Sequence, residues 1–132
     1  MTVRLVNPDS LAPPVGYAHA AVGTGKTIVL AGQIGCDRSG KVLEPNDLVK
    51  QFATALDNLL VALGEAGGRP EDLAQLRIFT TDVREYRSRL KDLGAVYRDR
   101  IGRHFPAMVL AGVTELFVPG SKVEIEGLAY VD

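Results

Sequence analysis

Two carboxylates near the C-terminus are the chemically suggestive pair of this sequence. They occur in the run Val-Glu-Ile-Glu at residues 123–126, where apolar and acidic residues alternate. Side chains of a β-strand alternate between its faces, so Glu124 and Glu126 would lie on the same face, about 7 Å apart. Like charges beside an apolar run are typical of acid–base sites. A solvated strand face would show the same pattern, and spacing alone leaves both interpretations open.

The elements that must position this pair can be read from hydrophobic periodicity and from turn residues. Helices are expected to begin near Asn46 or Asp47 and at Asp82, and to end at Gly67-Gly68 and Gly102. The turn-rich segment Gly23-Thr24-Gly25-Lys26 indicates a hairpin between its two flanking strands. The expected strands cover residues 2–6, 17–22, 27–34, 73–81, 105–113 and 123–129.

The resulting order is β-β-β-α-β-α-β-β, which predicts an α+β fold with a mixed β-sheet. Two strand–helix–strand segments with right-handed crossovers place both helices on one sheet face. Gln51 falls off the apolar stripe of the first helix. The opposite sheet face is expected to carry apolar side chains that a monomer could not leave in water, which predicts self-association. These side chains are Leu30, Ile34, Met108, Leu110 and Leu128.

Length and composition indicate a single domain spanning residues 1–132. The net charge is −1, and no basic block predicts contact with nucleic acid or an anionic membrane. A single cysteine, Cys36, and an N-terminus without an apolar signal segment favour a cytoplasmic protein. His19, His104 and Cys36 lack the spacing of metal ligands, so neither a metal nor another cofactor is expected.

One block of sequence is similar to a known family. Phe105-Pro106-Ala107-Met108-Val109, followed about sixteen residues later by Val-Glu-Ile-Glu, resembles the signature region of the RidA family, also called YjgF or L-PSP endoribonuclease-like. The resemblance extends back through Gly16-Tyr17, Ala31-Gly32-Gln33 and the helix around Asn58. It implies a chorismate-mutase-like homotrimer whose sheets enclose a central barrel, with small-molecule clefts between subunits. The charge distribution gives no support to a ribonuclease activity.

The resemblance also assigns roles to residues. It implies Glu124 as the catalytic group that positions water, with Tyr17, Gly32, Met108 and Leu110 binding the substrate. Active imine-deaminating members carry an arginine at the position of Met108, where it grips the substrate carboxylate, and often an asparagine at the position of Gly94. Methionine has no charge and cannot hold a carboxylate. Other basic residues could supply the missing cation, namely Arg4, Lys26, Arg98, Arg103 and Lys122.

Two functions follow from this departure. The first is a trimeric small-molecule-binding protein of this family that is not an efficient 2-imino acid deaminase. The second is a hydrolase or deaminase of a small imine, enamine or other C–N compound that lacks a carboxylate, with Glu124 directing water.

Overall fold

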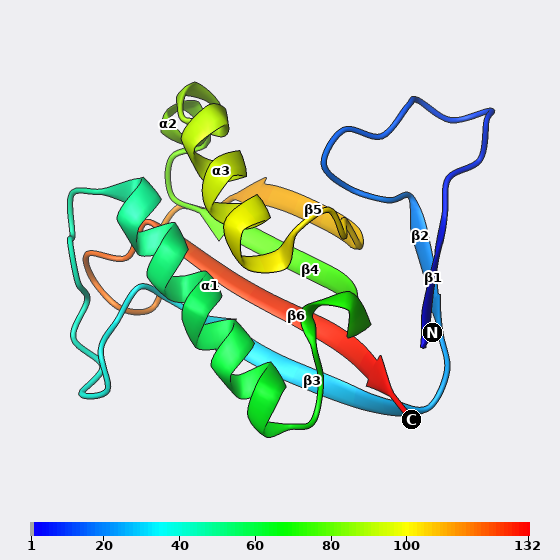
Figure 1. Ribbon diagram of the computed structural model, residues 1–132. Coiled ribbons are helices and arrows are strands. Elements are labelled where there is room, and N and C mark those ends of the chain that lie inside the picture. Colours follow the sequence, from blue (N-terminus) through cyan, green and yellow to red (C-terminus); the bar gives the residue numbers. More distant parts are fainter. Residues whose placement is uncertain (1) are drawn as a thin grey trace.

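A four-stranded mixed sheet forms the centre of the computed structural model, which describes residues 2–132 (Figure 1). Strand β6 lies between β3 and β4 and is antiparallel to both, whereas the edge strand β5 is parallel to β4. A separate two-stranded ribbon, β1 with β2, lies beside the sheet. The strands are β1 (Val3–Val6), β2 (Ala20–Gly23), β3 (Lys26–Gln33), β4 (Leu73–Thr80), β5 (Ala107–Gly112) and β6 (Val123–Val131).

Helices cover one face of this sheet, as the sequence predicts (Figure 1). They are α1 (Leu48–Glu65), the short α2 (Val83–Ser88) and α3 (Leu90–Ile101), with a 3-10 turn at Pro70–Asp72. Asp47 and Asp82 cap α1 and α2 by accepting hydrogen bonds from the backbone N–H groups of Lys50 and Glu85. The expected α+β fold is therefore confirmed. Among the described residues, no helix combines the length and apolar character needed to cross a bilayer.

The core lies between the helices and the covered sheet face. Ile28 and Leu30 of β3 and Ile78 of β4 are buried there with Phe52 and Leu56 of α1. Burial alternates along the strands because successive side chains point to opposite faces. The core therefore uses every second residue of the central strands and leaves the others on the open face.

The predicted hairpin across Gly23–Lys26 is wrong. Strand β2 pairs with β1, and β3 pairs with β6, which comes from the far end of the chain. A Cβ atom built at Gly25 would collide with the Val131 carbonyl, so this connection passes directly beside the C-terminal strand. The turn residues predicted a local pairing, but β2 takes β1 as its partner and the only sheet neighbour of β3 among residues 2–132 is β6.

The predicted composition of the open sheet face also needs correction. Leu30 is buried in the core, and Met108 and Leu110 pair across the ladder with Leu76 and Ile78, which face the helices. These three side chains therefore lie on the helix side. Leu128 lies on the open face as expected, together with Val29, Phe79 and Val109, and Val29 is 76% exposed. Ile34 lies beyond the end of β3 and is half-buried.

Candidate functional site

A cavity of about 650 Å³ opens on the helix side of the sheet, next to the edge strand β5. Its wall is formed by α2, α3, β5 and the loop at Val15–Tyr17. Tyr17, Met108 and Leu110, three of the residues expected to bind substrate, all line it. Most of the remaining lining is aliphatic or aromatic, and this size and character are those of a small-molecule pocket.

The loop that carries Tyr17 is held against β5 by backbone pairing. The Ala18 N–H donates to the Pro106 carbonyl over 3.0 Å, and Ala18 forms an isolated parallel bridge with Ala107. The Tyr17 ring packs edge-on against His19, with ring centroids 5.2 Å apart. These contacts hold Tyr17 in the cavity lining, next to the strand that presents Met108.

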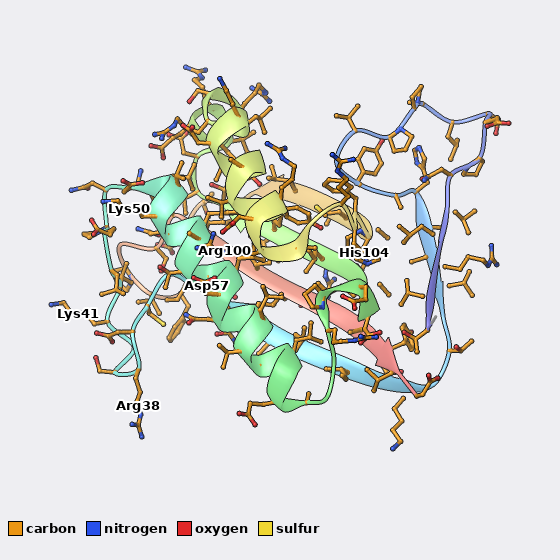
Figure 2. The ribbon with its side chains drawn as sticks, in the orientation of Figure 1. Arg38, Lys41, Lys50, Asp57, Arg100 and His104 are labelled. Carbon is orange, nitrogen blue, oxygen red and sulfur yellow. The ribbon has the colours of Figure 1, made fainter. Side chains whose placement is uncertain are left out.

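The entry into β5 is fixed by a second set of contacts around His104, which follows α3 (Figure 2). The Tyr97 ring of α3 stacks on Phe105 at 5.3 Å, and its hydroxyl donates to the His104 carbonyl over 2.7 Å. The His104 ring lies 2.7 Å from the Leu73 carbonyl at the start of β4. Burial raises the pKa of Tyr97, so its hydroxyl stays protonated and remains a donor. His104 therefore positions the strand, and the structure gives it no catalytic partner among the described residues.

Two arginines approach the cavity from the helices, Arg87 of α2 and Arg98 of α3. The lining contains no aspartate or glutamate, so its formal charge is positive. Tyr86, also in the lining, has a pKa raised to about 12 by burial and is neutral at physiological pH. The cavity thus combines an apolar interior with a cationic helix side.

Glu124 and Gly32 lie elsewhere, on the open face of the sheet. A Cβ atom built at Gly32 would collide with the carboxylate of Glu124, so that carboxylate lies directly over the glycine. On the neighbouring strand β4, Phe79 is the ladder partner of Glu124. The strand pattern was correct, because Glu124 and Glu126 do share this face.

The two carboxylates differ in their partners. Glu126 forms an ion pair with Arg77 of β4, with an N–O distance of 3.1 Å. Within residues 2–132, Glu124 has no basic group within 4.0 Å and accepts no hydrogen bond from a side chain. Glu124 is therefore available for a ligand, a water molecule or another chain, and Glu126 is neutralised internally.

One chain does not bring the expected site residues together. Tyr17, Met108 and Leu110 meet in the helix-side cavity, and Gly32 meets Glu124 on the opposite face of the sheet. The sheet itself separates the two groups. Any site that uses both groups has to combine the cavity of one chain with the open face of another.

Gln51 is a positioning residue that the sequence did not reveal. It is 1% exposed, and its amide nitrogen donates to the Glu44 and Gly120 carbonyls, both at 3.0 Å. Its amide oxygen accepts from the Lys122 N–H at 2.8 Å. Gln51 therefore holds the loop that leads into Glu124, although the helical pattern placed it off the apolar stripe. Within the described part of the chain, no cluster of three His, Cys, Asp or Glu side chains could hold a metal ion.

Comparison with known proteins identifies the relatives of this fold. Residues 7–131 match the family described as endoribonuclease L-PSP. A RutC family protein from Aquifex aeolicus is 32% identical over 130 residues, covering 96% of this chain and 98% of the relative. The 2-iminobutanoate/2-iminopropanoate deaminase of Rattus norvegicus is 29% identical over 128 residues, covering 96% and 90%.

Solved structures agree with the sequence comparison. The Yersinia pestis protein YyfB, described as a protein of unknown function of the conserved Rid family, superposes with a TM-score of 0.89 at 29% identity. That alignment covers 99% of this chain and all of the Yersinia chain. Similarity therefore extends over the whole domain, and named imine deaminases are among the relatives.

Proposed function

The chain belongs to the endoribonuclease L-PSP family, whose members also carry the names RidA and YjgF. From this membership we propose that it forms a homotrimer and binds a small molecule in the clefts between subunits. We also propose that it is not an efficient 2-imino acid deaminase. One observation carries the proposal: strand β5 presents Met108 and Leu110, and no basic residue, to the cavity.

Deamination of a 2-imino acid places two demands on a site. Water must attack the imine carbon; the C–N bond then breaks, ammonia leaves and a 2-oxo acid remains. The substrate carboxylate must also be held so that the imine carbon faces that water. Glu124 can meet the first demand by orienting the water and accepting its proton, since no basic side chain of its own chain neutralises it. Met108 cannot meet the second.

The missing contact has a large expected effect. Losing a desolvated arginine–carboxylate interaction costs about 2–5 kcal/mol, or roughly thirty-fold to several-thousand-fold in affinity. A substrate that is not anchored also loses its orientation toward the water, so turnover falls with binding. This is the physical reason to expect poor activity on 2-iminopropanoate.

The separation of Glu124 from the cavity supports the homotrimer. A cleft that contains both Met108 and Glu124 requires two chains, because the sheet separates these residues within one chain. The open face also leaves apolar side chains in water, and the Phe117 side chain, on the loop before β6, is 98% exposed. Burial of these surfaces between subunits would remove them from solvent.

A second candidate function is hydrolysis of an imine, enamine or other C–N compound without a carboxylate. The apolar lining near Met108 and Leu110 favours this alternative, because a neutral substrate needs no cation there. Glu124 would direct water in the same way. The two candidates differ in whether the bound compound is hydrolysed, which experiment can distinguish.

The test is hydrolysis of 2-iminopropanoate, generated from alanine by an amino-acid oxidase and trapped with semicarbazide. We expect the wild-type protein to leave the trapped imine nearly unchanged. Met108→Arg should raise the rate at least about tenfold, because it restores a bidentate carboxylate anchor on β5. Met108→Leu is the matched control and should show no gain.

Efficient hydrolysis by the wild-type protein would refute the proposal. A gain of equal size in Met108→Leu would show that side-chain shape, and not charge, limits the reaction.

A further inference from the structure

We propose that Arg98 of α3 supplies the cation that β5 lacks, so that the cavity binds a monocarboxylate with an apolar body larger than 2-iminopropanoate. This inference rests on the proposed function, since it takes the cavity around Met108 as the ligand site. Of the five basic residues that the sequence offers as replacements for the missing arginine, only Arg98 lines that cavity.

The position of Arg98 depends on Gly94, one turn earlier in α3. Long side chains on a helix lean toward its N-terminus, and residues i and i+4 lie on the same face. A Cβ atom built at Gly94 would lie 3.1 Å from an Nη atom of Arg98, so the guanidinium folds back over the glycine. A larger side chain at position 94 would crowd that conformation. Met108 and Gly94 are the two departures from the sequence pattern of imine-deaminating family members, and one change accounts for both: the cation is carried by Arg98 on α3 in place of an arginine on β5.

Among residues 2–132, Arg98 also has no acidic partner. The acidic residues of α2, α3 and the preceding cap each have another partner. Asp82 caps α2, Glu85 pairs with Lys122 at 2.8 Å, and Asp92 pairs with Arg89 at 3.0 Å. Asp99 lies 3.5 Å from Arg100, which is also bound to Asp57.

Within residues 2–132, neither Arg98 nor the neighbouring cavity arginine, Arg87, has a carboxylate within 4.0 Å. Two guanidinium groups at an apolar cavity without acids attract an anion.

The apolar lining indicates the rest of the ligand. Leu90, Leu93, Phe105, Met108 and Leu110 surround the space beside Arg98. A three-carbon imino acid would occupy only a small part of about 650 Å³ and would leave most of this lining without contact. A branched or aromatic carboxylate can place its charge at Arg98 and its hydrocarbon body against Met108 and Leu110.

The experiment compares two probes of nearly equal shape, 3-phenylpropanoate and its neutral analogue 3-phenylpropanamide. Their binding to the full chain is measured by isothermal titration calorimetry at fixed ionic strength in a chloride buffer. We expect the carboxylate to bind at least about tenfold more tightly than the amide, as expected for a charge-assisted contact at a partly exposed site.

Variants test whether Arg98 is responsible. Arg98→Gln should weaken carboxylate binding about tenfold and leave amide binding unchanged, and Arg98→Lys should retain part of the preference. Arg103→Gln is the control, because Arg103 is exposed on the loop after α3 and does not line the cavity. Circular dichroism confirms that each variant is folded.

Equal affinity for the two probes, or an equal loss in Arg103→Gln, would overturn the role of Arg98 and leave the cavity as a site for neutral ligands, as the second candidate function requires. Failure of both probes to bind would overturn the inference as well. If Met108→Arg then also gained no hydrolysis, the proposed function would fall with it.

Discussion

Gln51→Met removes three hydrogen bonds from the core while leaving the side chain nearly the same length. The substitution leaves the Glu44 and Gly120 carbonyls and the Lys122 N–H without their partner at a site where Gln51 is 1% exposed. Methionine fills the space, so a cavity does not contribute to the loss.

At about 1 kcal/mol for each hydrogen bond, the free energy of unfolding should fall by about 3 kcal/mol. The entropy of unfolding is about 2.1 cal/mol/K per residue, so a loss of 3 kcal/mol lowers the Tm of a 132-residue chain by about 11 °C.

The assay is thermal unfolding followed by circular dichroism, with all variants at one chain concentration because association shifts Tm. Lys50→Met is the matched control: it introduces the same residue one position earlier, where the side chain is exposed and its ion pair with Glu44 spans 4.0 Å. That control should stay within about 2 °C of the wild-type protein. A loss below about 3 °C in Gln51→Met would show that the three bonds do not hold the loop before Glu124.

Two further predictions concern assembly and the placement of Glu124. Light scattering at low micromolar concentration should give about three times the chain mass of 14.2 kDa, and a monomer at every concentration would contradict the homotrimer. Gly32→Ala should leave Tm nearly unchanged, because the new methyl group meets only the Oε2, Cδ and Cγ atoms of Glu124, a flexible side chain that can turn away. In a Met108→Arg background it should nevertheless lower imine hydrolysis about tenfold by displacing that carboxylate; an unchanged rate would assign Glu124 to a surface role.

The local features of this chain could be predicted from sequence because they depend on residues close together along it. The order of strands and helices follows from hydrophobic periodicity. Asp47 and Asp82 predict the starts of α1 and α2, because aspartate is a preferred N-cap residue. The shared face of Glu124 and Glu126 follows from the two-residue repeat of a strand. That position 108 carries methionine and no cation is read directly from the sequence.

The tertiary structure decided everything that depends on long-range pairing. Strand β6 inserts between β3 and β4, which places Gly32 beside Glu124, and β2 pairs with β1 instead of forming the expected hairpin with β3. The parallel register of β5 on β4 sets which face Met108 joins, and a shift of one residue would have put it on the other.

Gln51 and Arg98 show the same limit. Neither has a sequence signal for its role, because the partners of Gln51 lie up to 71 residues away and the cavity beside Arg98 is lined by residues spread along the chain from Val15 to Leu110. Periodicity states which residues share a face of one element. The pairing of elements decides what that face meets.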